Sequence, residues 1–291
     1  MSSLSIILQS PILITLLAGI VGLLVGSFLN VVIYRLPIMM QRGWRNECEE
    51  FLELPITKHT PEIFNLSLPR SHCPQCEKGI KAYQNIPVFS YLFLRGKCAN
   101  CGAGISIRYP FVEALTAVLS MVVAYQLGGQ LATLFALLLT WSLIVLSGID
   151  FDKQLLPDSI TLPMLWLGIL LSLFNVFADP TASIIGAIAG YLILWSIYQL
   201  FKLLTGKEGM GYGDFKLLAL FGAWLGWQYL PLIILLSSLV GATIGVTMII
   251  FLGRDKSIPI PFGPYLAIAG WIALLWGEQL NMLYLTYVGL Q

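Results

Sequence analysis

The sequence predicts an all-α polytopic membrane protein with about eight transmembrane helices and a small cytoplasmic domain between the first two. Three observations lead to this prediction. Of the 291 residues, 57% are hydrophobic and only 11% are charged, which is typical of integral membrane proteins. The apolar residues form runs long enough to cross a bilayer, and the basic residues fall between runs on one side. The net charge of +1 does not indicate a nucleic-acid partner.

The apolar runs define the expected membrane helices. They lie near residues 12–34, 110–127, 131–149, 159–177, 181–203, 213–229, 231–252 and 262–285. No cleavable signal peptide is evident, because no basic residue precedes the first run, which is itself long enough to span. The polar segment 35–109 is the only stretch long enough for a soluble domain. We therefore expect three parts: a first transmembrane helix over 1–34, a cytoplasmic domain over 35–109, and a seven-helix membrane domain over 110–291.

The basic residues predict the orientation. With eight spans, all sixteen Lys and Arg residues fall on the same side of the membrane. The positive-inside rule makes that side cytoplasmic. Both termini then lie outside, in the periplasm if the cell is Gram-negative.

Two aspartates are expected at the cytoplasmic membrane edge. Asp150 directly follows the third run, and Asp214 follows the glycine-rich stretch 206–213. A helix from Asp214 to Tyr229 would rise only about 23 Å at ~1.5 Å per residue, less than the ~30 Å hydrocarbon core, so Asp214 is drawn towards the edge. An ionisable group at that depth is by default functional. Two such carboxylates held close together share one proton, the arrangement that aspartic peptidases use.

The aspartates also have structural interpretations. Asp214 could simply N-cap the next helix, and the sequence spacing does not show that Asp150 and Asp214 meet in space. Asp158 follows Pro157 and is expected to N-cap the fourth membrane helix. Asp152 is expected to face water, as is the acidic side chain within residues 254–256. The alternating glycines 209, 211 and 213 allow unusual backbone conformations or close approach of another segment.

The cysteines predict a structural metal site. Cys73, Cys76, Cys98 and Cys101 form two C-x₂-C pairs with 21 residues between them. Tetrahedral Zn²⁺ binds four thiolates, which leaves no open position for catalysis. Two disulfides are the alternative, and a cytoplasmic location disfavours them. The glycines that follow each pair suit tight turns. We expect His72 to lie at the surface, and we assign no role to Cys48.

Taken together, the motifs resemble the type IV prepilin peptidases, which are GxGD intramembrane aspartic proteases. The match covers nearly the whole chain. It rests on Gly26–Pro37, Ser71–Cys76, Arg95–Cys101, Arg108–Glu113, Ile149–Asp158, Gly211–Asp214 and Pro261–Pro264.

This resemblance implies a bifunctional enzyme of the bacterial inner membrane. The family cleaves a short basic leader from type IV prepilins and type II secretion pseudopilins, after a glycine at the cytoplasmic membrane edge. It then N-methylates the new N-terminal residue with S-adenosylmethionine. The carried-over catalytic residues are Asp150 and Asp214, which makes the seven-helix part the catalytic domain. The oligomeric state is left open.

The resemblance also assigns supporting residues. Gly96 and Lys97 resemble family residues associated with methylation; the alternative is a basic turn that supports the second cysteine pair. The supporting loops contain Gly211, Gly213, Pro261, Gly263 and Pro264. We expect 261–264 to be an irregular segment at the membrane edge that accepts the substrate backbone.

Two polar residues within the spans are expected to be structural. Glu113 is expected to pair with Arg108 or with a lysine of the active-site loops, because an unpaired acid inside a span is costly. Asn30 is expected to bond between helices.

Two other function classes remain possible from the sequence alone. One is a proton-coupled transporter, although its carboxylates would be expected near the bilayer midplane and in repeated halves. The other is a non-catalytic platform that binds cytoplasmic partners through the cysteine domain.

Overall fold

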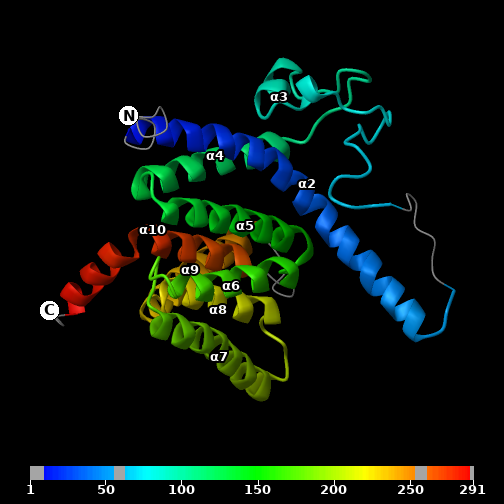
Figure 1. Ribbon diagram of the computed structural model, residues 1–291. Helices are drawn as coiled ribbons and strands as arrows, with labels where there is room; N and C mark the ends of the chain where they lie inside the picture. Colours follow the sequence, from blue (N-terminus) through cyan, green and yellow to red (C-terminus); the bar gives the residue numbers. More distant parts are fainter. Residues whose placement is uncertain (1–9, 56–62, 253–260, 289–291) are drawn as a thin grey trace. The chain divides into compact units, whose positions relative to one another are not determined.

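The computed structural model describes residues 10–55, 63–252 and 261–288, which are mainly helical and contain no strand (Figure 1). These residues form eight helices of fourteen residues or more, one for each predicted run. They are α2 Pro11–Phe51, α4 Arg108–Leu127, α5 Leu131–Lys153, α6 Asp158–Ser172, α7 Pro180–Thr205, α8 Tyr212–Leu225, α9 Leu230–Leu252 and α10 Gly263–Val288. Six are long and apolar enough to cross a membrane, and α6 and α8 are shorter. The predicted solvated loop 254–256 lies outside the described residues.

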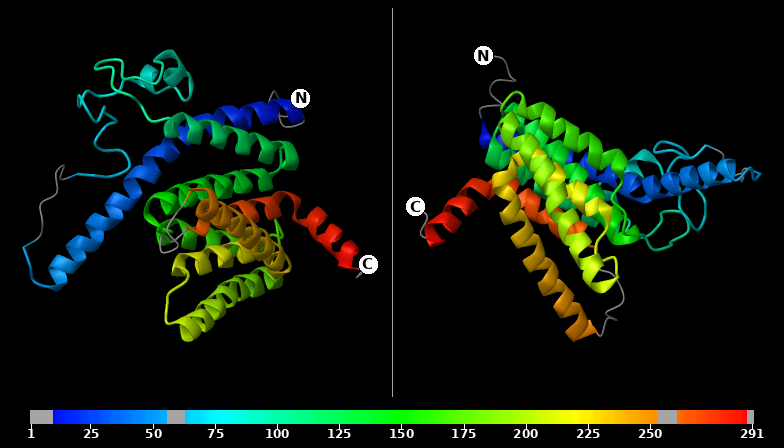
Figure 2. Two further views of the ribbon diagram at one scale, coloured as in Figure 1. Left: turned by 180° about the vertical axis from the view of Figure 1, so that it is seen from behind. Right: turned by 90° about the horizontal axis from the view of Figure 1, so that it is seen from below.

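The chain divides into two compact units, residues 1–133 and 134–291. In the first unit, α2 and α4 lie side by side (Figures 1 and 2). A Cβ atom at Gly22 would lie 2.8 Å from the Cα of Ala117, so the two backbones approach closely. The buried Asn30 donates from Nδ2 to the carbonyl of Tyr109 at 3.1 Å, which confirms its expected helix–helix role.

Helix α2 continues well beyond the expected membrane segment, to Phe51. Its extension contains an ion pair one turn apart, Arg45 to Glu49 at 2.9 Å, of the kind that supports an exposed helix. The buried Arg35 donates to the carbonyls of Asn65 and Pro69 at 2.9 and 2.6 Å. These bonds hold the segment after the helix against α2.

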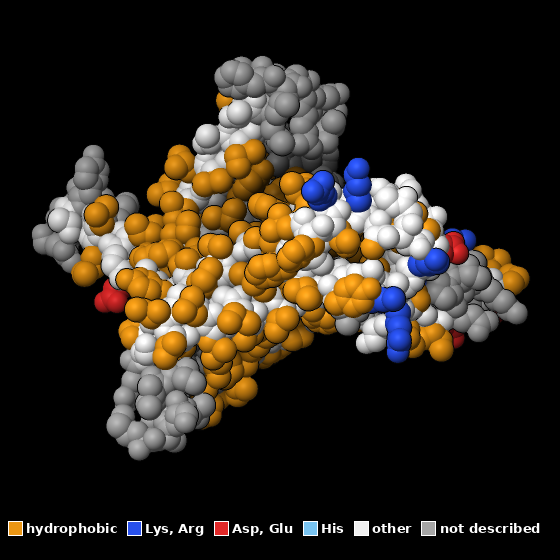
Figure 3. Space-filling model, turned by 90° about the horizontal axis from the view of Figure 1, so that it is seen from above, with side chains coloured by type: hydrophobic (Ala, Val, Ile, Leu, Met, Phe, Trp, Pro, Cys, Tyr) orange, Lys and Arg blue, Asp and Glu red, His pale blue; other side chains and the backbone are white. Residues whose placement is uncertain are grey.

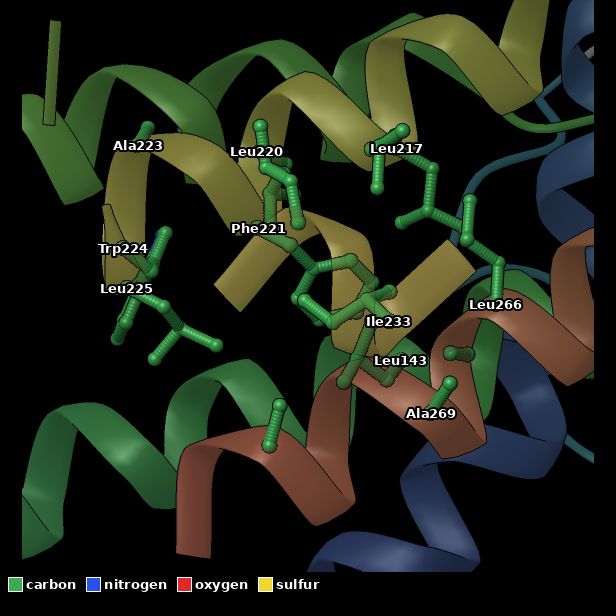
Figure 4. Close-up of a cluster of buried hydrophobic side chains, with 14 of the residues drawn as sticks. Leu143, Leu217, Leu220, Phe221, Ala223, Trp224, Leu225, Ile233, Leu266 and Ala269 are labelled. Carbon is green, nitrogen blue, oxygen red and sulfur yellow. The ribbon is translucent and has the colours of Figure 1, made fainter. Parts of the chain in front are cut away.

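Helix α8 is the buried centre of the second unit. Residues 217–225 are all buried, and α8 packs against α6, α7, α9 and α10. Figure 4 shows its side chains, such as Phe221, meeting Ile233 of α9 and Ala269 of α10. A helix enclosed by other helices can be shorter than the bilayer, because protein rather than lipid surrounds its ends. The predicted span 213–229 was therefore too long: α8 ends at Leu225, its C-cap Gly226 has a φ of +88°, and a short 3₁₀ helix follows (η2, Trp227–Tyr229).

Glycines set the packing of α7 on α8. A Cβ atom at Gly222 would lie 2.0 Å from the carbonyl oxygen of Gly186, and one at Gly190 would lie 2.7 Å from that of Leu218. Ser183 adds a hydrogen bond to the carbonyl of Ala223 at 2.6 Å. Gly186 and Gly190 form a G-x-x-x-G pattern, which permits such contact between membrane helices.

Many large hydrophobic side chains of the described residues are exposed. Hydrophobic side chains cover much of the face drawn in Figure 3. Along α7, the side chains of Ile188, Leu192 and Leu200 are about half exposed, as expected of a helix that faces lipid.

Candidate active site and metal centre

Asp150 lies in the last turn of α5 and is only 5% exposed. Its Oδ2 atom accepts a hydrogen bond from the backbone N–H of Gly263 at 3.1 Å. A Cβ atom at position 263 would lie 2.6 Å from the same oxygen. Glycine at the start of α10 therefore lets the backbone reach the Asp150 carboxylate.

Asp214 is the third residue of α8 and is 7% exposed. The N-cap position is taken by Gly211, and no side chain caps this helix, so the N-cap interpretation of Asp214 was wrong. The preceding Gly213 would bring a Cβ atom within 2.7 Å of the Leu156 side chain. Gly211 and Gly213 do not have positive φ values. At Gly213, close approach is the property of glycine that the fold uses.

The two aspartates line one cavity of about 310 Å³. Three segments form its wall, contributed by the end of α5, the start of α8 and the residues before α10. The lining residues are Asp150, Gln154, Leu156, Glu208, Gly209, Met210, Gly211, Gly213, Asp214, Pro261 and Phe262. The alternative that Asp150 and Asp214 are unrelated in space is excluded. Pro261 and Phe262 lie outside a helix, as predicted for 261–264. The other half of that prediction was wrong, because Gly263 and Pro264 are the first two residues of α10, where proline is well tolerated.

Asp158 does not N-cap α6, contrary to the prediction. The N-cap residue is Pro157, and Asp158 is the first helical residue. Its carboxylate instead accepts hydrogen bonds from Nζ of Lys216 on α8, at 2.7 Å to each oxygen. The partner of the Asp158 carboxylate is therefore the ammonium group of Lys216 and not the backbone N–H groups of the first turn of α6. The nearby Asp152 is exposed, as expected.

The four cysteines form a cluster with the geometry to hold a metal ion. The Sγ atoms of Cys73, Cys76, Cys98 and Cys101 all lie within 4.8 Å of one another. The Cys73 and Cys101 sulfurs are 3.8 Å apart, close to the ~3.8 Å edge of a tetrahedron with Zn–S bonds of ~2.3 Å. All four thiols are free, so the disulfide alternative is not supported. The donor set fits a structural zinc ion.

The two cysteine pairs lie in turns with the same hydrogen bonds. The amide of Cys73 donates to the carbonyl of Lys78 at 3.0 Å, and the amide of Cys98 donates to that of Ala103 at 2.7 Å. The positive φ values within these turns occur at Glu77 and Gly102. Of the glycines that follow each pair, only Gly102 is needed for its backbone conformation; Gly79 and Gly104 pair with His72 and Lys97 in short antiparallel bridges.

Local donors favour the thiolate at the second ligand. The backbone N–H of Lys78 and the side-chain amide of Asn100 lower the pKa of Cys76 to about 6. The thiolate is the form that binds a metal. His72 is exposed beside this site, as expected, and Cys48 is exposed.

Comparisons with known proteins place this architecture in a family. Residues 20–127 match the family model described as "Bacterial Peptidase A24 N-terminal domain", and residues 137–246 match "Type IV leader peptidase family". Proteins named "Prepilin leader peptidase/N-methyltransferase" are similar along nearly their whole length. The chain is 55% identical to one from Stutzerimonas stutzeri over 290 residues, 100% of both chains. It is 57% identical to one from Aeromonas hydrophila, covering 91% of each.

The chain belongs to the type IV leader peptidase family. A third relative of that name, from Pseudomonas aeruginosa, is 55% identical over 96% of both chains. No solved structure matches the chain.

In this type IV leader peptidase, Gly96 has a structural explanation. Its φ is +69°, and a Cβ atom there would lie 2.9 Å from the Tyr91 hydroxyl. Its carbonyl accepts from the amide of Ile105 at 2.7 Å, next to the bridge between Lys97 and Gly104. This geometry favours the interpretation of a turn that supports the second cysteine pair. The Lys97 side chain is exposed, and the methylation role of both residues remains a prediction.

The partner of Glu113 was predicted wrongly. Among the described residues, its Oε2 atom accepts from the backbone N–H of Val88 at 2.7 Å, and the side chain of Ser27 donates a second hydrogen bond to its carboxylate. Val88 lies in the loop between the cysteine pairs, 25 residues away. A backbone donor carries no sequence signal, so this contact could not be predicted from residue types.

Two charged residues near the cavity were not singled out from the sequence. Glu208 lines the cavity and accepts from Lys202 at 2.8 Å, which lowers the pKa of Glu208. Lys216 follows Asp214 by two residues and pairs with Asp158. The position of Lys216, two residues after the GxGD motif, is the sequence feature from which a role near the cavity could have been predicted.

Proposed function

We propose that this chain is an intramembrane aspartic endopeptidase that releases the leader of prepilins and pseudopilins, and that it then methylates the new N-terminus. The observation that carries the proposal is the shared cavity of Asp150 and Asp214, two buried carboxylates at helix ends. The names of relatives that match the chain over at least 91% of its length support both activities.

The cleavage mechanism follows from the paired acids. Both carboxylates are buried and line one cavity. They therefore cannot both ionise, so one is protonated and the other is a carboxylate. The carboxylate takes a proton from water, and the water oxygen forms a bond to the scissile carbonyl carbon. The protonated acid donates a hydrogen bond to the carbonyl oxygen. The tetrahedral intermediate then collapses: the C–N bond breaks, and the leaving amine takes a proton from the acids. The Gly263 N–H orients the Asp150 carboxylate.

The position of the cavity supports cleavage at the membrane edge. Asp150 lies at the end of a spanning helix, and Pro261 and Phe262 line the cavity without belonging to a helix. Pro261 and Phe262, just before Gly263 and Pro264 at the start of α10, would bind the extended backbone of the substrate. Cleavage after a glycine would suit a narrow site, because the side chain before the broken bond needs no room.

Two cofactors belong to the proposal. Zinc would be held by the four cysteines and would fix the fold of the domain within residues 35–109, without taking part in the chemistry. S-adenosylmethionine would supply a methyl group to the freed α-amine, and Gly96 and Lys97 are the candidate residues for that activity.

The proposed location is the bacterial inner membrane. Lys153, Lys202, Lys207 and Lys216 lie near the helix ends that surround the cavity. Under the positive-inside rule that side is cytoplasmic, which places both termini in the periplasm. The domain boundaries at 34/35 and 109/110 are part of this proposal.

The function is tested by a digest in lipid. The purified protein is mixed with a synthetic prepilin segment, comprising the leader, the Gly–Phe junction and part of the helix, together with S-adenosylmethionine. We expect mass spectrometry to detect release of the leader after glycine and one added methyl group on the new N-terminus. A relative from Pseudomonas aeruginosa serves as the positive control. If the relative cleaves the segment and this chain leaves it intact, the proposal fails, and a transporter or platform function is favoured.

A further inference from the structure

The short helix α3, Phe89–Phe93, presents an apolar face that the described residues do not cover. Phe89, Leu92 and Phe93 are 54%, 65% and 86% exposed. Positions i, i+3 and i+4 of a helix lie on one face, so the three side chains form a single surface. Ile86, just before the helix, adds a side chain that is 48% exposed. We call these four residues the α3 face.

A hydrogen bond fixes the depth of this face along α4. The amide of Val88, immediately before α3, donates to Glu113 at 2.7 Å. Glu113 is five residues after Arg108, the first residue of α4, and thus about 7.5 Å along the helix axis at ~1.5 Å per residue. Because α4 is a spanning helix, α3 begins near the level where that helix enters the membrane. Figure 1 and the left view of Figure 2 show α3 close to the start of α4.

The charges around the face complement an anionic surface. Between residues 63 and 107 the chain has five basic residues and one acid, Glu77. A zinc ion with four thiolates would carry about two negative charges, so the basic residues would still exceed the acids. Lys81, Arg95 and Lys97 lie close to α3 in the sequence, and all three side chains are exposed.

We propose that the α3 face inserts into the headgroup region of the membrane and anchors the cysteine domain on the anionic lipid surface. The interfacial layer is ~7 Å thick on each side of the hydrocarbon core, and the bond between Val88 and Glu113 holds the start of α3 within two helical turns of the first residue of α4. Aromatic and aliphatic side chains bind there, with basic neighbours contacting the lipid phosphates. The anchor holds the domain at the height of the membrane edge, independently of the reaction the enzyme catalyses.

The test is photocrosslinking of the full chain in lipid vesicles. The photoreactive analogue p-benzoylphenylalanine replaces Phe93, or Gln75 as the matched control, since Gln75 is an exposed polar position in the same domain. The vesicles contain phosphatidylethanolamine and phosphatidylglycerol. Mass spectrometry measures lipid adducts and protein adducts, and an unchanged circular dichroism spectrum verifies the fold.

The proposal predicts at least about fivefold more lipid adduct at position 93 than at position 75. It also predicts a severalfold lower yield at position 93 when phosphatidylcholine replaces the anionic lipid. Equal lipid yields at the two positions would overturn it. Adducts at position 93 mainly to this chain, or to an added prepilin segment, would show that the α3 face binds protein, which also overturns it. An unchanged yield of lipid adduct at position 93 without anionic lipid would contradict the proposal that the domain binds an anionic surface.

Discussion

Two glycines set the geometry of the two aspartates. At Gly263 the absent side chain leaves room for the Asp150 carboxylate, which accepts from the backbone N–H. At Gly213 it leaves room for Leu156, whose side chain lines the same cavity. Both sites depend on close contact rather than on an unusual φ. The nearest atom to a Cβ at Gly211, by contrast, is an Asp214 oxygen at 3.8 Å.

The glycines of the GxGD motif should therefore differ in their tolerance to alanine. We expect Gly213→Ala to lower the rate of leader cleavage by at least about tenfold, because the new methyl group displaces Leu156 or α8 and misplaces Asp214. Gly211→Ala should keep the rate within about threefold, since its Cβ meets only van der Waals contact. The initial rate of cleavage of a prepilin segment is measured for each variant. Thermal denaturation checks that the two variants are equally stable. Equal losses at the two positions would contradict the packing argument.

For single residues, the sequence predicts which side chains come together in the two sites better than it predicts their hydrogen-bond partners. Asp150, Asp214 and the four cysteines were predicted from residue type, spacing and flanking apolar runs, and the structure groups them accordingly. The partners of Asp158 and Glu113 were wrong. These partners lie 58 and 25 residues away in the sequence. Only the tertiary structure determines which residues so far apart in the sequence come into contact.

At the scale of helices, one ion pair connects α6 and α8 near the cavity that contains the two aspartates. Lys216 of α8 binds Asp158 at the start of α6, with side chains 28% and 52% exposed. The loop between α5 and α6 contains Leu156, which contacts Gly213. The pair thus links the start of α8 to the end of this loop. An ion pair at this exposure contributes only about 0.2–1 kcal/mol to stability, so we expect it to affect the position of α8 more than the stability of the fold.

A charge swap should test this pairing. We expect Lys216→Asp alone to lower the rate of leader cleavage severalfold, because two acids then repel across the α6–α8 contact. Adding Asp158→Lys should restore most of the rate, since the pair is re-formed in reverse. Cleavage kinetics of both single variants and the double variant give the coupling. A double variant slower than either single variant would show that the two residues act separately.

The existence of the helices was easier to predict than their ends. All eight long helices correspond to apolar runs. These runs could be found from the sequence because hydropathy depends on the local residue types and not on tertiary contacts. Helix α2 runs on to Phe51 through a polar segment with its own local ion pair, which hydropathy does not detect. Helix α8 is short because neighbouring helices enclose it. The packing of α7 on α8 through Gly186 and Gly222 requires tertiary contact and was not predicted.

For the whole molecule, the division into two units separates the metal centre from the cavity. The cysteine cluster lies in residues 1–133, whereas Asp150 and Asp214 lie in residues 134–291. Each unit has its own helix packing, through α2 with α4 in the first and through α8 in the second. Metal binding should therefore stabilise the first unit alone.

Removal of the metal should have a local effect. We expect a chelator to raise hydrogen exchange at the amides of Cys73 and Cys98 by at least about tenfold, because the thiolates no longer hold the two turns together. Amides in α8, from Leu217 to Leu225, should exchange as before. Hydrogen–deuterium exchange with mass spectrometry measures both regions in one sample. Loss of protection in α8 would show that the two units depend on the same metal.

The most direct test of the central claim compares Asp150→Asn, Asp214→Asn and the double variant in leader cleavage. If the carboxylates act as one pair, each single variant lowers kcat by at least about a thousandfold, and the double variant loses little more. Methylation of a synthetic peptide that begins at the mature N-terminus, together with thermal stability, shows that the variants remain folded. A single variant that keeps a tenth or more of the native rate would contradict the account, because the nucleophile would then lie elsewhere.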